Sequence, residues 1–131
     1  MRFFLRKNQR LNSEKDISNL FLSGKTLYVY PLKLVFLLKE ENTKEVKVLF
    51  SVPKKYFKKA IWRNTIRRRI KEAYRINSYF RSPVNTELQM AFIYISKEII
   101  DYKEIEVAVK ELLTQLKNIL DTKIDLNNSN I

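Results

Sequence analysis

The chain has 131 residues, of which 26 are lysine or arginine and 14 are aspartate or glutamate, so its formal net charge is +12. It contains no histidine and no cysteine, and Gly24 is its one glycine. This composition excludes a histidine general base, a cysteine zinc site and a glycine-rich phosphate loop.

The length and a hydrophobic content of 45% indicate one domain, which we assign to residues 1–124. Residues 125–131 are mostly polar, and we predict that they form a disordered tail. Charged residues interrupt the apolar positions of residues 1–10, and no apolar run has the length of a membrane span. We therefore expect a cytoplasmic protein without a signal peptide or membrane contact, in keeping with the absence of cysteine.

The spacing of apolar residues predicts six elements in the order α-β-β-α-β-α. They are a helix over 14–23, strands over 32–38 and 46–52, a basic helix over 56–79, a strand over 88–96 and a helix over 105–120. We expect the first two strands to form a hairpin across residues 40–44. This order predicts an α+β fold, in which a small mixed or antiparallel sheet packs with about three helices as a two-layer sandwich.

The segment 54–75 contains ten basic residues and one acid, Glu72. At 100° per residue, one helical face is apolar and the opposite face is polar and basic. Like charges one turn apart repel, so a polyanion such as a nucleic-acid backbone would stabilise this face. A solvated charged surface is the alternative. The residues that we predict to bind nucleic acid are Arg63, Asn64, Arg67, Arg68, Lys71, Arg75, Lys54 and Lys55.

The acidic residues are scattered along the chain, whereas metal-dependent nucleases need carboxylates that converge on one site. We therefore expect no catalytic residue and no metal site in the protein. Asn64 could contact RNA or could instead stabilise the start of the basic helix. Trp62 is expected in the core or at the edge of an RNA interface.

Two motifs resemble the signature of the bacterial ribonuclease P protein component. The run Ser51-Val52-Pro53-Lys54-Lys55 is similar to the family's strand end, Ser-Val-x-Lys-Lys. The runs Arg63-Asn64-Thr65-Ile66-Arg67-Arg68 and Lys71-Glu72 are similar to its helix motif, Arg-Asn-Arg-x-Lys-Arg-x-x-Arg-Glu. Arg10-Leu11, Asp16, Phe21 and Gly24 also match, and the element order agrees over about residues 5–120.

The chain departs from the family pattern at three places. Thr65 stands where the family usually has an arginine, so one cation of the motif is missing. The Gly-Asn pair that usually follows the two lysines is absent, and residues 57–59 occupy that stretch. Ile17 replaces a position that is usually aromatic.

The resemblance implies the RNA-binding subunit of ribonuclease P, which removes the 5′ leader from precursor tRNA. In that family the catalytic RNA subunit holds the active site and its Mg²⁺ ions, and the arginine-rich helix binds this RNA. The face of the sheet beside the first helix holds the single-stranded leader, and the strand–helix–strand crossover is left-handed.

Carried over to this chain, the resemblance implies that Phe21 and Phe36 stack on leader bases, although both also fit core positions. The expected partners are the RNA subunit and precursor tRNA, with the protein monomeric in the complex. The alternative function is that of a ribosomal or other structural RNA-binding protein without a role in cleavage.

Overall fold

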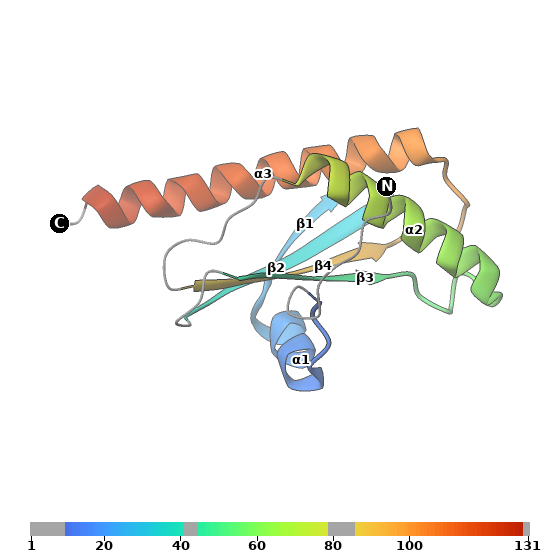
Figure 1. The fold of residues 1–131 in the computed structure, drawn as a ribbon, viewed down its shortest axis with the longest axis horizontal. Helices are drawn as coiled ribbons and strands as arrows, with labels where there is room; N and C mark the ends of the chain where they lie inside the picture. Colours follow the sequence, from blue (N-terminus) through green and yellow to red (C-terminus); the bar gives the residue numbers. More distant parts are fainter. Residues whose placement is uncertain (1–9, 41–44, 79–85, 130–131) are drawn as a thin grey trace.

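The chain folds around one four-stranded sheet that has helices on both of its faces (Figure 1). The structure, a computed structural model, describes residues 10–40, 45–78 and 86–129, and for residues 123–129 it describes the backbone alone. In chain order the elements are α1 (Glu14–Ser23), β1 (Lys25–Val29), β2 (Leu32–Glu40), β3 (Val46–Ser51), α2 (Ala60–Asn77), β4 (Thr86–Tyr94) and α3 (Tyr102–Ser129). The predicted α+β class, with three helices and a mixed sheet, is confirmed.

The strand order of the sheet is β1-β2-β4-β3. Strand β2 pairs antiparallel with β1 and with β4, whereas β3 pairs in parallel with β4. The predicted hairpin between β2 and β3 is therefore wrong, because β4 lies between them. Residues 41–44 of the expected turn lie outside the described residues.

Strand β1 is the element that the sequence did not predict. It forms an edge of the sheet, and its residues alternate between exposed and partly buried positions without a long apolar run. Its pairing with β2 begins with Lys25 opposite Phe36. This short hairpin takes the place in the sheet that the prediction assigned to β3.

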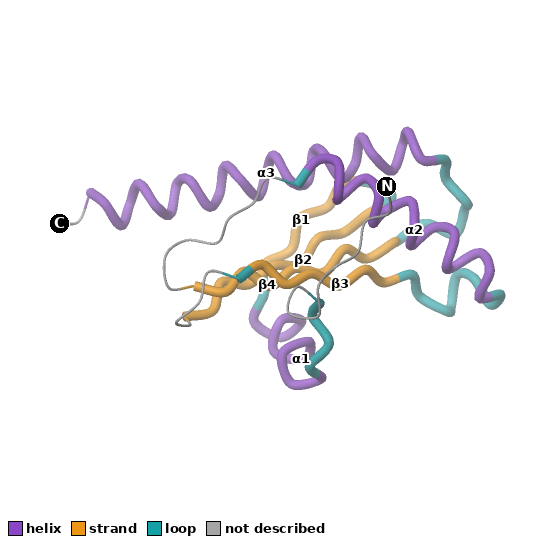
Figure 2. The backbone as a smooth tube through the Cα atoms, in the orientation of Figure 1, coloured by secondary structure: helices purple, strands orange, loops and turns teal. Residues whose placement is uncertain are grey.

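Helix α2 connects the parallel strands β3 and β4 and packs on the same face of the sheet as α3. This is the crossover whose left hand the resemblance implies, and that hand stays a prediction. Helix α1 lies on the opposite face, so it adds a short third layer to the predicted two (Figure 2).

The main core lies between the sheet and helices α2 and α3. At its centre the ring of Phe50 stacks on Phe92 at a centroid distance of 5.8 Å, and Tyr74 of α2 meets both rings edge-on. A smaller cluster on the other face buries Leu20 of α1 against Val35 of β2. Burial of apolar side chains on both faces fixes the register of the central strands.

Helix α1 has the predicted bounds because both of its ends are stabilised locally. The hydroxyl group of Ser13 accepts a hydrogen bond from the backbone N–H of Asp16 at 3.3 Å, which caps the first turn. Gly24 ends the helix, and a Cβ atom there would lie 2.4 Å from the carbonyl oxygen of Leu20 and 2.9 Å from Val35 Cγ1. The close approach of α1 to the sheet therefore requires glycine.

The other two helices differ from the prediction in length. Helix α2 begins at Ala60 because residues 53–59 form a loop, and the expected end at residue 79 lies outside the described residues. Helix α3 continues to Ser129, where we expected a disordered tail from residue 125. Each further residue adds one hydrogen bond to a helix that has already formed. Extension of α3 therefore avoids the unfavourable nucleation step that a new helix would require. The assignment of one domain to residues 1–124 stays a prediction.

Phe36 lies in the main core with an exposed fraction of 2%. The alternation of β2 directs it toward α2 and α3, whereas Val35 faces α1. The expectation that Phe36 lines an open face for the leader is therefore wrong. Phe21 of α1 is 47% exposed and stays accessible.

These two phenylalanines form a matched pair for a stability measurement. Phe36→Ala removes a fully buried ring and should lower the free energy of unfolding by about 3–5 kcal/mol. Phe21→Ala should lower it by about 1 kcal/mol or less, because half of that ring is already in water. Urea denaturation followed by circular dichroism measures both values, and equal losses would contradict this placement of the two rings.

Candidate RNA interface

Helix α2 presents its cations to solvent because its apolar face is fixed in the core. Ile66, Ile70, Ala73 and Tyr74 are buried against the sheet and α3. Trp62 is 43% exposed, so it lies at the edge of this packing rather than within it. The helix therefore cannot turn its charged face inward without exposing its apolar one.

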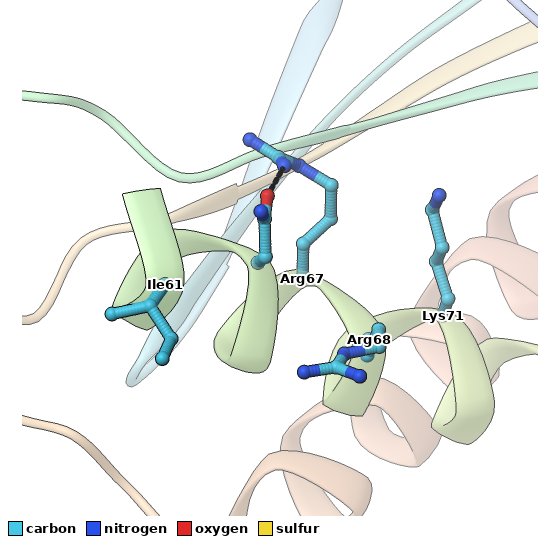
Figure 3. A pocket seen from close by; sticks show the side chains of 5 residues that line it. Ile61, Arg67, Arg68 and Lys71 are labelled. Carbon is cyan, nitrogen blue, oxygen red and sulfur yellow. Dashed lines mark hydrogen bonds between the residues drawn. The ribbon is translucent and has the colours of Figure 1, made fainter. Parts of the chain in front are cut away.

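Five residues of α2 line an open hollow of about 590 Å³, which we call the basic hollow. They are Ile61, Asn64, Arg67, Arg68 and Lys71. Figure 3 shows Arg67 and Lys71 extending from the same side of the helix. The amide oxygen of Asn64 accepts a hydrogen bond from Arg67 Nη1 at 2.8 Å. Asn64 thus orients one of the cations, a role that the spacing of the residues alone did not reveal.

The cations of the basic hollow lie close enough to affect one another. Partial burial lowers the pKa of Lys71, and the positive charges of Arg67 and Arg10 lower it further. Arg10 is held near Lys71 by the backbone. It forms an isolated parallel β-bridge with Val48 of β3, and the N–H of Leu11 donates to the carbonyl oxygen of Val48 at 3.2 Å. A bound anion would relieve the repulsion among the three cations.

The sequence prediction missed Ile61, which lines the basic hollow, and Arg10, whose charge acts on Lys71 beside it. Arg10 is distant from α2 in the chain, so helical spacing could not group it with Lys71. Ile61 is 64% exposed and gives the hollow an apolar wall, although its residue type suggested a core position.

Arg63 and Arg75 were predicted to act with the same face but have partners within the protein. The guanidinium group of Arg63 donates to the carbonyl oxygens of Phe57 and Lys58 at 2.7 and 2.8 Å, which holds the loop before α2. Arg75 forms an ion pair with Glu72, and its hydrogen bond lowers the pKa of that carboxyl group. The structure therefore brings only part of the predicted set around the hollow.

The remaining predicted cations lie in the loop between β3 and α2. Lys54 and Lys55 are exposed there, and Lys55 Nζ lies 5.0 Å from the centroid of the Tyr56 ring. Thr65, at the family's usual arginine position, donates its hydroxyl hydrogen to the carbonyl oxygen of Ile61 at 2.9 Å. Because threonine is uncharged, this position adds no cation to the surface.

Arg69 has a structural role. Its guanidinium group donates to the carbonyl oxygen of Ile100 at 2.8 Å and so ties α2 to the loop before α3. Arg68 is exposed, and its side chain has no hydrogen-bond partner within residues 10–40, 45–78 and 86–122. Adjacent arginines on one helix thus serve different purposes.

The described residues offer no group of three or more acidic side chains that could hold a metal ion. Among the described helices, none combines the length and the apolar character needed to cross a membrane. Fold and surface together define a small α+β protein with a solvent-exposed basic helix.

Comparison with known proteins identifies the family. The family model described as Ribonuclease P matches residues 5–119. A ribonuclease P protein component from Porphyromonas gingivalis is 35% identical over 119 residues, which cover 87% of each chain. The chain belongs to the ribonuclease P protein family.

Solved structures agree with this fold. The Staphylococcus aureus RNase P protein superposes with a TM-score of 0.65 at 16% identity and covers 87% of this chain and 99% of its own. The RNase P protein from Thermotoga maritima gives a TM-score of 0.65 at 22% identity, with 81% and 96% covered.

Arg68→Ala and Arg69→Ala should differ in their effect on stability, because only Arg69 has a hydrogen-bond partner within the described residues. Loss of the Arg69 hydrogen bond should lower the free energy of unfolding by about 1.5–3 kcal/mol, because a charged donor is removed from a backbone carbonyl group. Loss of Arg68 should change it by no more than about 0.5 kcal/mol. Chemical denaturation measures both, and an Arg69 variant as stable as the Arg68 variant would contradict the assignment.

Proposed function

We propose that this protein is the RNA-binding subunit of a ribonuclease P ribonucleoprotein and binds the catalytic RNA subunit through the basic hollow of α2. The observation that carries the proposal is the grouping of Arg67, Arg68, Lys71 and Arg10 without an acidic side chain among the residues that line the hollow. Membership of the ribonuclease P family supports the choice of RNA partner.

Several neighbouring cations would add to this surface. Lys54 and Lys55 would contribute diffuse attraction from the loop before α2. Arg63 and Arg75 could contact RNA as well, but each would share its guanidinium group with its partner in the protein. Asn64 would keep Arg67 in place and could also contact RNA directly.

The 5′ leader of precursor tRNA would lie on the face of the sheet beside α1. Phe21 is half exposed on that helix and could stack on a base. Lys33, Leu37 and Leu49 lie on the same face and are partly exposed. Stacking and backbone charge would tolerate different leader sequences, because every base offers a flat face.

Hydrolysis itself would belong to the RNA. We propose that the Mg²⁺ ions are held by the RNA subunit and the substrate, since the described residues offer no carboxylate cluster for them. The protein would then raise the affinity for precursor tRNA and neutralise phosphates. A cytoplasmic location and a single copy of the protein in the complex also stay predictions.

The dependence of binding on salt tests the basic hollow. Four phosphate contacts should give a slope of log K against log salt of roughly −3 to −4 for the RNA subunit. The double variant Arg67→Ala/Arg68→Ala should flatten that slope by up to about 2. Filter binding over a series of salt concentrations measures the slope.

The matched control is Lys103→Ala/Lys110→Ala, which removes the same charge from exposed positions of α3. This control should leave the slope nearly unchanged, because Debye screening suppresses the effect of distant surface charges. If both double variants flatten the slope equally, the effect is one of net charge and the basic hollow is not the binding site.

A second prediction concerns the leader. Phe21→Ala should weaken binding of precursor tRNA to the reconstituted complex by about 1–3 kcal/mol, the value of one lost stack. Mature tRNA, which lacks the leader, should bind as before. Equal losses for the two RNAs in a competition assay would show that Phe21 does not contact the leader.

The alternative is a structural RNA-binding protein without a role in cleavage. It would share the basic helix and the salt dependence, but it would not distinguish precursor from mature tRNA. The leader assay therefore also separates the two functions.

A further inference from the structure

The basic hollow has an apolar wall, which binding of phosphates alone does not explain. Ile61 is 64% exposed and lines the hollow together with Asn64, Arg67, Arg68 and Lys71. A single exposed apolar side chain is ordinary on a protein surface. Phosphate oxygens, however, are bound by cations and polar donors, so a surface for phosphates would gain nothing from isoleucine. The place of Ile61 inside the hollow therefore indicates a partner that is partly apolar.

The polar groups that the hollow offers to a partner are hydrogen-bond donors. Arginine and lysine side chains can only donate. The amide oxygen of Asn64 already accepts a hydrogen bond from Arg67 Nη1 at 2.8 Å, which leaves the NH2 group of Asn64 for a partner (Figure 3). A partner that fits the hollow should therefore present hydrogen-bond acceptors beside its apolar part.

A nucleotide whose base is unpaired combines these properties. Its base has an apolar face that can pack on a side chain, whereas the bases of a duplex are stacked on one another. Its phosphate oxygens accept hydrogen bonds from arginine and lysine. The hollow measures about 590 Å³, and sites of roughly 300–1,000 Å³ hold small organic ligands. It is therefore large enough for a whole nucleotide and not only for a phosphate group.

The spacing along α2 suits a base at one end of the hollow and phosphates at the other. Figure 3 shows Ile61 at one end, Lys71 at the other and Arg67 between them. At about 1.5 Å of rise per residue, Arg67 lies roughly 9 Å along the helix axis from Ile61. A nucleotide with its base on Ile61 would place its phosphate near Arg67. Lys71 lies one turn further, where the next phosphate of the chain would follow.

The same donors favour bases that carry a carbonyl group. Guanine presents O6 and N7 as acceptors and uracil presents O4, whereas adenine and cytosine carry an amino group at the corresponding place. That amino group would direct a donor at the NH2 group of Asn64 and leave both without a partner. We propose that the basic hollow binds an unpaired guanosine or uridine nucleotide of the RNA subunit, with its base on Ile61 and Asn64 and its phosphate on Arg67 and Lys71.

This inference rests on the proposed function, because it names the part of the RNA subunit that the hollow would hold. It adds a requirement that phosphate binding alone does not make. The loss of Ile61 should weaken binding although no charge is removed.

Ile61→Ala tests the apolar contact in the complete protein. It should lower the affinity for ribonuclease P RNA by roughly 3- to 20-fold, because the shortened side chain no longer covers the base. The slope of log K against log salt should stay unchanged, since this variant removes no cation. Filter binding over a series of salt concentrations measures both quantities. Arg67→Ala/Arg68→Ala, measured in parallel, should change the slope instead.

Two further variants make the test specific to the hollow. Ile61→Leu retains the apolar wall and should bind nearly as well as the unmodified protein. Val107→Ala shortens an apolar side chain of α3 that is 66% exposed, close to the exposure of Ile61, and should leave the affinity unchanged. Thermal melts followed by circular dichroism should be similar for these variants, because both positions are exposed and alanine favours helix.

Free nucleotides test the preference for a base. The monophosphates GMP, UMP, AMP and CMP, and ribose 5-phosphate, are added separately to the ¹⁵N-labelled protein and followed by nuclear magnetic resonance. GMP and UMP should shift the side-chain amide signal of Asn64 and the backbone amide signal of Ile61 at lower concentrations than AMP and CMP. Ribose 5-phosphate lacks a base and should require the highest concentration.

Unchanged affinity of Ile61→Ala for ribonuclease P RNA would overturn the inference. So would responses to GMP that equal those to AMP or to ribose 5-phosphate, or the absence of any shift at Asn64 and Ile61. None of these results would affect the role of the cations, which the salt slope of Arg67→Ala/Arg68→Ala reports. Failure of the unmodified protein to bind ribonuclease P RNA would instead overturn the proposed function.

Discussion

The structure depends on how α2 divides its two faces between the core and the solvent. Ile66, Ile70 and Tyr74 pack against the sheet and α3, and this burial holds Arg67 and Lys71 together on the opposite side. Apolar burial thus opposes electrostatic repulsion within one helix, and it prevails because each buried large side chain stabilises by about 1.5–3 kcal/mol. The cations therefore stay close together, and a bound anion would reduce the repulsion among them.

The sheet gives this arrangement a second surface. Because β2 and β4 bury side chains on both faces, the sheet separates α2 and α3 from α1. The basic hollow and the face beside α1 therefore belong to one rigid support. In the proposed complex, this support would hold the RNA subunit and the substrate at a fixed relative position, without any catalytic side chain in the protein.

Local signals predicted the helices and most strands well, whereas pairing between distant strands could not be read from one sequence. The capping residue Ser13 and Gly24 set the bounds of α1, and the alternation in β3 was visible. Strand β1 is only five residues long and lies at the edge of the sheet, so its pattern did not stand out, and its omission led to the wrong partner for β3. The direction of Phe36 and the approach of Arg10 to Lys71 likewise depend on tertiary structure.

The most direct test of the central claim is reconstitution with a bacterial ribonuclease P RNA at low magnesium, where phosphate repulsion is poorly screened. The account predicts that the unmodified protein restores cleavage of precursor tRNA at the mature 5′ end, that Arg67→Ala/Arg68→Ala restores much less, and that the protein without RNA cleaves nothing. Full restoration by the double variant, or cleavage by the protein alone, would contradict it.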